Sequence, residues 1–221
     1  MAKKKLIHFT ENLSFPHLFQ PRYAELQPSF RFQGKWGSDF FRNDHPITLE
    51  LGCGKGEYTV GLARQFPTRN FIGIDVKGAR LWRGCKTVEE DHLLNVAFIR
   101  SLADHIEYLF QPGEVGEIWI TFPEPQPGKE RKRLTAPVFL NRYHRILQPN
   151  GLVHLKTDDQ DLFRYTKEIL KEHPVELLLE TEDLYHEYKH EPAAKIQTFY
   201  ESIWLEREKK IAYLRFRFIN T

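Results

Sequence analysis

The 221-residue sequence has only two cysteines, one methionine and no long apolar run. Two cysteines, Cys53 and Cys85, are too few for a disulfide framework, and their spacing matches no metal site. No apolar segment approaches the roughly 20 residues of a membrane span, and the basic start lacks the apolar stretch of a signal peptide. The ten histidines form no constellation. We therefore expect no metal and no membrane segment, and a reducing cytoplasm fits best.

The chain also lacks a strong charge imbalance, because its formal net charge is +2. The basic residues are nevertheless concentrated in three places: Lys3 to Lys5, Lys129 to Arg133, and Arg207 with Lys209 and Lys210. Each concentration alone is most simply a solvated face or tail. Together they favour a polyanion as partner.

Residues 1–46 lack clear periodicity and carry aromatic side chains among polar ones. Prolines at 16, 21 and 28 interrupt any long helix. We interpret this region as an N-terminal extension with a flexible basic tip, a possible contact for RNA. Its aromatic residues are expected to pack on the main domain or on a partner, with core packing as the default.

From residue 47 to 221, short apolar runs alternate with helical segments, which predicts an α/β domain with a doubly wound, mostly parallel sheet. Five runs are expected as parallel strands: 47–51, 70–75, 96–99, 117–121 and 152–156. A turn at 148–151 precedes the fifth. The run 175–181 reads as a sixth strand, and 211–218 alternates as an edge strand does. The prediction is a seven-stranded sheet with an antiparallel C-terminal edge strand.

The segment Thr48 to Glu57 combines a strand end with a glycine-dense turn and a helix start. Glycines at 52, 54 and 56 allow tight turning and close approach to a ligand. A dinucleotide fingerprint would need its third glycine at 57, where Glu57 stands. Glu50 is a carboxylate within an apolar strand end, which is costly to bury without a role. An acid before G-x-G-x-G is the pattern of enzymes that bind the cation S-adenosylmethionine.

Polar residues follow every predicted parallel strand, where ligands of doubly wound sheets bind. They include Asp75 after the second strand, suited to both ribose hydroxyls, and Ser101 after the third, with Asp104 one turn later. Asp158 and Asp159 follow the fifth strand and, like Asp75, could instead be helix caps. The accumulation favours a site on the sheet rim.

After the fourth strand comes Phe122-Pro123-Glu124-Pro125. The two prolines bias Phe122 and Glu124 toward extended conformations and should hold the Glu124 carboxylate rigidly. A stiff loop with a solvated glutamate is the plainer interpretation, but such rigidity also suits catalysis. The basic stretch from Lys129 follows directly and suits phosphate contacts.

Five motifs in order make the chain resemble the bacterial tRNA (guanine-N7-)-methyltransferase family, over about residues 47 to 218. They are Glu50 to Gly56, Phe71 to Asp75, Phe122 to Pro125, Thr157-Asp158, and Thr198-Phe199-Tyr200-Glu201. The resemblance implies a Rossmann-like methyltransferase sheet, S-adenosylmethionine as cofactor and tRNA as partner, with the variable loop as the expected target.

The resemblance also implies roles for individual residues. Cofactor contacts would come from Glu50, Gly52, Gly54, Asp75, Ser101 and Glu124. Glu124 would also be the active-site acid, and Asp158, Thr198 and Glu201 would hold the target nucleotide. Lys129, from the basic stretch, is the further substrate-binding residue, expected to contact phosphate. Many members have Asp at the position of Glu124, Trp at that of Gln126, and a longer, His-containing basic stretch. The usual Asp after the third strand is Ser101 here, unless Asp104 substitutes.

The residues agree with N7 chemistry, because guanine N7 has a free lone pair and needs no strong base. A pyrimidine C5 target would want a cysteine nucleophile near the fourth strand, and an exocyclic amine would favour an N-P-P-Y-like loop; the sequence has neither. Two alternatives stay open: a methyltransferase for a small molecule or protein, and a binding protein without turnover. The sequence leaves monomer and homodimer equally open.

Overall fold

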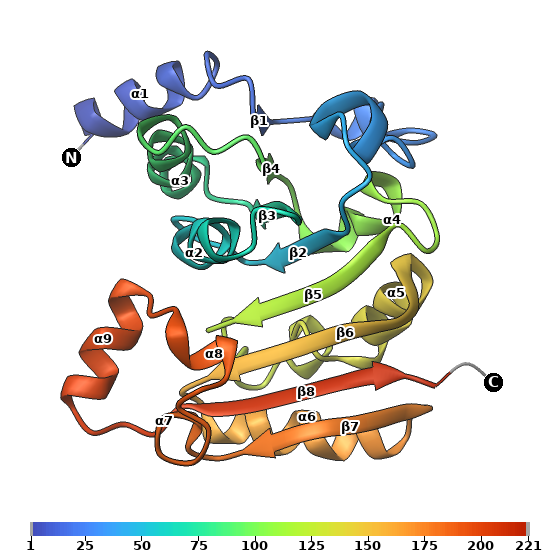
Figure 1. Ribbon diagram of the computed structural model, residues 1–221, viewed down its shortest axis with the longest axis vertical. Coiled ribbons are helices and arrows are strands. Elements are labelled where there is room, and N and C mark those ends of the chain that lie inside the picture. Colours follow the sequence, from blue (N-terminus) through green and yellow to red (C-terminus); the bar gives the residue numbers. More distant parts are fainter. Residues whose placement is uncertain (1, 220–221) are drawn as a thin grey trace.

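The computed structural model describes residues 2–219, with side chains from residue 6 onward, and its centre is an eight-stranded sheet (Figure 1). The strands in chain order are β1 (Leu18–Phe19), β2 (Ile47–Leu51), β3 (Asn70–Asp75), β4 (Val96–Arg100), β5 (Val115–Thr121), β6 (Leu147–Thr157), β7 (Val175–Thr181) and β8 (Ala212–Phe218). Their order across the sheet is β1-β4-β3-β2-β5-β6-β8-β7. Neighbours pair in parallel from β1 to β6, whereas β8 runs antiparallel to both β6 and β7. The doubly wound, mostly parallel sheet is confirmed.

Two details of the sheet differ from the prediction. The sheet has eight strands rather than seven, because β1 from the N-terminal region pairs with β4. The antiparallel C-terminal strand is present, but it lies inside the sheet, and β7 forms the edge. The alternation of β8 marks one fully apolar face, with Leu214 and Phe216 in the core. Its other face pairs Arg215 with Glu191 at 2.9 Å.

Helices cover both faces of the sheet (Figure 1). The helices are α1 (Ala2–Glu11), α2 (Glu57–Gln65), α3 (Gly78–Glu90), α4 (Ile106–Leu109), α5 (Pro137–Ile146), α6 (Gln160–Lys171), α7 (Leu184–Glu187), α8 (Pro192–Lys195) and α9 (Phe199–Glu206). Short 3-10 turns span Tyr23–Leu26, Ala103–His105 and Glu130–Lys132, and a π-helix spans Trp36–Phe41. Among residues 2–219, none of these helices combines the length and apolar character needed to cross a bilayer.

The sheet separates two apolar cores. One core joins α4, α5 and α6 to residues such as Ile118 and Ile120 of β5. The other joins α2, α3 and the short C-terminal helices to Trp119 of the same strand. Because successive side chains of a strand point to opposite faces, burial on both sides requires a continuous apolar run. This explains why the central strands were recognisable in the sequence.

Most of the N-terminal aromatic residues pack in the first core, as the default interpretation expected, although Phe15 lies in the second core and Tyr23 is exposed. Phe19, Phe30, Trp36 and Phe41 are all buried there. The Trp36 indole Nε1 donates a hydrogen bond to the carbonyl of Leu109 at 3.0 Å. The expected flexible tip lies partly outside the described residues, since Met1 and the side chains of residues 2–5 are not described.

The turn expected at 148–151 is an excursion within β6 rather than an element boundary. Leu147 pairs with Val115, and Leu152 pairs with Glu117. Residues 148–151 therefore stand opposite Gly116 alone, and Asn150 has φ +63°. Pro149 and Asn150 suit this bend, and the apolar residues on either side keep the strand in register.

Candidate functional site

Four of the six predicted cofactor residues, but not Glu50 or Gly54, line one cavity at the carboxyl ends of the parallel strands. A cavity of about 470 Å³ opens there, and Gly52, Asp75, Ser101 and Glu124 all line it. These residues lie at or just after the ends of β2, β3, β4 and β5. The four strands are adjacent in the sheet, in the order β4-β3-β2-β5. Drug-sized ligands occupy pockets of roughly 300–1,000 Å³, so the cavity has the volume for a nucleoside-sized ligand.

The glycine turn leaves open space on the ligand side. Gly52 and Gly54 have φ of +74° and +57°. A Cβ built on Gly52 would have its nearest neighbour at 3.9 Å, and one built on Gly54 would meet nothing within 4 Å. Gly56 differs, because its Cβ would lie 2.5 Å from the Phe98 ring. The first two glycines thus leave room above the turn, whereas Gly56 is required by packing below it.

Glu50 lies beneath the turn and is 3% exposed. Its Oε2 accepts hydrogen bonds from the backbone N–H of Thr59 at 2.8 Å and from the Thr59 hydroxyl, and its Oε1 accepts one from the Thr121 hydroxyl at 2.5 Å. Burial raises the pKa of Glu50 to about 7, the hydrogen bonds oppose this rise, and nearby Asp75 adds to it. A cation bound nearby would therefore favour the ionised form.

Asp75 ends β3 and ties the second strand end to the glycine turn. Its Oδ2 accepts a hydrogen bond from the Gly54 N–H at 3.0 Å, and its Oδ1 accepts one from the Lys77 N–H at 2.7 Å. Each carboxylate oxygen can accept a second hydrogen bond. Asp75 can therefore bind a pair of ribose hydroxyls while it keeps the turn in place.

Ser101 and Asp104 both line the cavity after β4. The Ser101 hydroxyl is 3.1 Å from Nδ1 of His105. The Asp104 carboxylate is engaged instead by Arg142, whose guanidinium donates to Oδ1 at 3.0 Å. Of the two candidates, Ser101 has the side chain less committed to an ion pair.

Glu124 is exposed at the cavity, between two prolines. The prolines predicted an extended conformation at Phe122. This prediction is wrong, because Phe122 has φ +47°. A left-handed conformation at a non-glycine residue is strained and needs support from its surroundings. That support includes a hydrogen bond from the Phe122 N–H to the Lys156 carbonyl at 2.8 Å. Rigidity of the Glu124 carboxylate stays a prediction, and this tertiary hydrogen bond supports it in addition to the prolines.

Arg133 braces the same loop from the other side. It is 8% exposed, and its Nε donates to the Pro125 carbonyl at 3.0 Å. Its guanidinium lies 4.2 Å from the centre of the Tyr165 ring. The sequence had grouped Arg133 with the phosphate-binding stretch, but the structure gives its side chain a bracing position.

Of the other cations of this stretch, Lys132 lines the cavity. Lys129 and Arg131 are exposed but are not part of the cavity lining. On the opposite side, exposed Lys77 and Arg80 line the same cavity. The opening therefore has cations on two sides, which suits an anionic macromolecule.

Asp158 and Asp159 have different roles after β6. Asp159 caps α6, because its Oδ1 accepts the Leu162 N–H at 2.7 Å. Asp158 is not a cap; its Oδ2 lies 2.5 Å from Nζ of Lys209, and its side chain is 21% exposed. The sequence left open which of the two acids is a helix cap, and the structure gives that role to Asp159.

Thr198 and Glu201 form a capping box at the start of α9. The Thr198 hydroxyl accepts the Glu201 N–H at 3.3 Å, and Glu201 Oε2 accepts the Thr198 N–H at 3.2 Å. Glu201 is 0% exposed and its Oε1 lies 2.5 Å from Nζ of the equally buried Lys156. Contact of these two residues with a nucleotide stays a prediction, and Lys156 is a residue that sequence reasoning missed.

The chain resembles known tRNA methyltransferases along most of its length. A family model described as "Putative methyltransferase" matches residues 44–214. A tRNA (guanine-N(7)-)-methyltransferase of Christiangramia forsetii is 51% identical over 220 residues, which cover 98% of each chain. The protein of that name from Bacteroides thetaiotaomicron is 46% identical over 98% of this chain and 86% of its own length. That of Bacillus subtilis is 34% identical over 70% of this chain and 73% of its own.

Solved structures share the fold at low sequence identity. The 16S rRNA methyltransferase KamB aligns with a TM-score of 0.59 at 15% identity, over 77% of this chain and 86% of that one. An antibiotic-related methyltransferase aligns with a TM-score of 0.59 at 17% identity, over 82% and 92%. These likenesses confirm the methyltransferase type of sheet. Together with the near-complete relatives, the comparisons show that the chain belongs to the family of tRNA (guanine-N(7)-)-methyltransferases.

Proposed function

We propose that this protein transfers a methyl group from S-adenosylmethionine to N7 of a guanine in tRNA, with the variable loop as the expected target. One observation carries the proposal: an open glycine turn with two acids, Glu50 and Asp75, adjoins the Glu124 loop inside a rim of cations. Family membership supports the reaction, and the shape and charge of the cavity support the proposed binding residues. The cytoplasmic location expected from the sequence is part of the same proposal.

The cofactor residues fit S-adenosylmethionine, which supplies an activated methyl group on a sulfonium cation. Gly52 and Gly54 leave space above the turn, and Glu50 offers negative charge beneath it. Asp75 retains acceptor capacity for ribose hydroxyls, and Ser101 lines the far part of the cavity. Glu124 lines the same cavity and can approach both cofactor and substrate.

The chain's own contribution to the chemistry is alignment and charge. Because N7 attacks with a free lone pair, no group has to remove a proton. Holding two reactants in line is worth up to about 7–11 kcal/mol in favourable cases. The methylated purine is cationic, so the Glu124 carboxyl group is placed to stabilise the charge that develops on it. The hydrogen bonds that Phe122 and Arg133 make on either side of Glu124 would keep its carboxyl group at the cavity.

tRNA would bind across the basic rim. Exposed Lys129 is the expected phosphate contact, with Lys132, Lys77 and Arg80 around the same opening. Asp158, at the end of β6, is partly exposed and would bind the target nucleotide after its ion pair with Lys209 opens. Neutralising phosphates in this way makes affinity fall steeply with salt concentration.

The test is to incubate the purified protein with methyl-labelled S-adenosylmethionine and unmodified tRNA, and to identify the nucleoside that carries the label. We expect N7-methylguanosine from tRNA, none from free guanosine, and a KM for tRNA that rises steeply with ionic strength. Label on a small molecule or protein, independent of salt, would support the alternative methyltransferase. Binding of cofactor and tRNA without labelled product would contradict catalysis.

A further inference from the structure

Helix α9 packs on the rest of the protein through an acidic side chain. In α9 (Phe199–Glu206), the one side chain that is buried is Glu201, a carboxyl group. Phe199 and Tyr200 point outward and are 55% and 54% exposed. Amphipathic helices normally dock through an apolar stripe. Here the helix is held at its first turn by an acid.

The partner of Glu201 is Lys156, which is 0% exposed in β6. Besides the 2.5 Å contact with Glu201 Oε1, its Nζ donates to the carbonyls of Ala193 at 2.5 Å and Ile196 at 3.1 Å. An ammonium group has three donors, so all of them are used. One lysine thus binds α8, the α8–α9 connection and α9.

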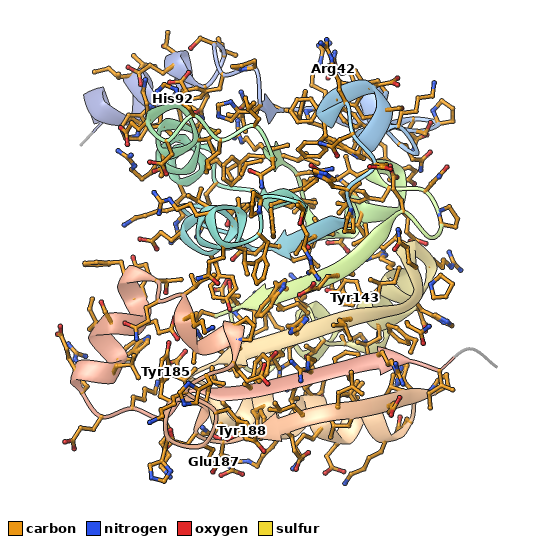
Figure 2. The ribbon with its side chains drawn as sticks, viewed as in Figure 1. Arg42, His92, Tyr143, Tyr185, Glu187 and Tyr188 are labelled. Atoms are coloured by element: carbon orange, nitrogen blue, oxygen red, sulfur yellow. The ribbon has the colours of Figure 1, made fainter. Side chains whose placement is uncertain are left out.

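Tyr185 completes the cluster around Glu201. Its hydroxyl donates to Glu201 Oε1 at 2.6 Å, and Figure 2 shows Tyr185 on the same side of the molecule as α9. A buried ion pair is favourable only if its remaining donors and acceptors are satisfied. In this cluster they are satisfied, whereas removal of either partner would leave a buried charge unpaired.

Lys156 also contacts the Glu124 loop. Its backbone carbonyl accepts the N–H of Phe122, the strained residue at the start of that loop. Its side chain contacts the same residue, because Nζ lies 5.9 Å from the centre of the Phe122 ring. The next residues of the chain, Thr157 and Asp158, lie at the end of β6. One residue of β6 therefore contacts both the Glu124 loop and the segment that carries α9.

On the outer side of α9, the exposed aromatic pair stands beside the glycine turn. Nζ of Lys55, in that turn, lies 5.0 Å from the centre of the Phe199 ring and 6.0 Å from that of Tyr200. The Phe199 N–H also donates to Glu57 at 3.4 Å. Exposed aromatic rings with a nearby cation suit contact with unpaired nucleotides, and their position depends on how α9 is docked.

We propose that Lys156 and Glu201 form a latch that positions α9 and the Glu124 loop for tRNA, and that Glu201 acts through Lys156 rather than by touching the nucleotide. The inference rests on the proposed function. Lys156 and Glu201 are positioning residues in this account. Neither of them lines the cofactor cavity, so we expect the latch to affect tRNA much more than the cofactor.

A double-mutant cycle tests the latch with Lys156→Met, Glu201→Met and the double variant. The measurements are kcat and KM for tRNA, Kd for S-adenosylmethionine, the melting temperature, and amide hydrogen exchange of residues 192–206. We expect each single variant to lose at least tenfold in kcat/KM for tRNA, with the cofactor Kd within twofold of wild type. The double variant should lose no more than the worse single variant, melt at a higher temperature than both, and exchange faster in residues 192–206.

The matched control is the surface pair Lys167–Glu180, at 3.0 Å with partly exposed side chains. Lys167→Met should leave kcat/KM for tRNA unchanged. If the losses from Lys156→Met and Glu201→Met multiply in the double variant, Glu201 acts on the substrate directly and the latch is wrong. The latch is equally wrong if residues 192–206 stay protected in the double variant. A wild-type protein without tRNA methylation would overturn the proposed function alone, because hydrogen exchange and melting still test the latch.

Discussion

Replacing Glu50 with glutamine should stabilise the ligand-free protein at alkaline pH and weaken cofactor binding. Glutamine has the same shape, can accept the Thr59 hydrogen bonds through its oxygen, and can donate its NH₂ to the Thr121 hydroxyl, which accepts after rotation. What the substitution removes is the cost of a buried charge.

The magnitude follows from the pKa of Glu50, which burial raises from 4.5 to about 7. Because the folded-state pKa is the higher one, the contribution of the neutral carboxyl group is fully present below pH 4.5 and is lost as the pH rises through about 7. The loss amounts to about 3 kcal/mol, at 1.36 kcal/mol for each pKa unit. For a chain of this size, that is roughly 6–12 °C in melting temperature.

The assay is thermal unfolding of both proteins between pH 4.5 and 8.5, with and without S-adenosylmethionine. Without ligand, the melting temperature of Glu50→Gln should exceed that of the wild type only slightly near pH 5, and the difference should reach its full size above pH 7.5. With ligand at alkaline pH, the melting temperature of the wild type should rise more than that of the variant, because a cationic ligand above the turn would lower the cost of the buried Glu50 charge. The Kd of the variant should be at least tenfold higher. A difference in stability that is constant across this pH range would refute the reasoning.

Three further predictions concern the turn, the loop and the N-terminal core. Gly54→Ala should raise the Kd for S-adenosylmethionine at least tenfold and lower the free energy of unfolding by about 1 kcal/mol. The control is Gly113→Ala, which is also at positive φ in open space. In denaturant titrations it should lose the same stability, but its Kd for S-adenosylmethionine should not change. Arg133→Met should lower kcat for tRNA about tenfold by freeing the Pro125 carbonyl, with unchanged cofactor Kd by calorimetry; an effect confined to tRNA KM would instead indicate a phosphate contact. Trp36→Ala should cost about 3–5 kcal/mol in urea unfolding, and a loss below 1 kcal/mol would show that residues 15–41 are not part of the core.

The sequence predicted those elements whose signal is local. Residues 47–51 and 70–75 were predicted as strands with the bounds that the structure shows, because both are short, mostly apolar runs in which every residue is buried. The strand ends then placed Gly52, Asp75, Ser101 and Glu124 at one cavity. The sheet topology, rather than any single motif, made that prediction possible.

The sequence could not predict features that depend on distant partners. The two-residue strand β1 forms because the edge of β4 is free to pair with it. Two residues are too few to show the alternation of polar and apolar residues that predicts a strand. Arg133 and Lys156 are basic residues whose type suggests solvent exposure, yet each is buried against groups 8 to 45 positions away along the chain. The left-handed Phe122 is similar, because its conformation is supported by a carbonyl of β6.

The central claim is that Glu124 acts in methyl transfer at a cofactor site to which it contributes only one of several contacts. Glu124→Ala should therefore abolish formation of N7-methylguanosine in tRNA, while calorimetry still shows S-adenosylmethionine binding within about threefold of wild type. A Glu124→Ala variant that methylates tRNA at the wild-type rate would contradict the account.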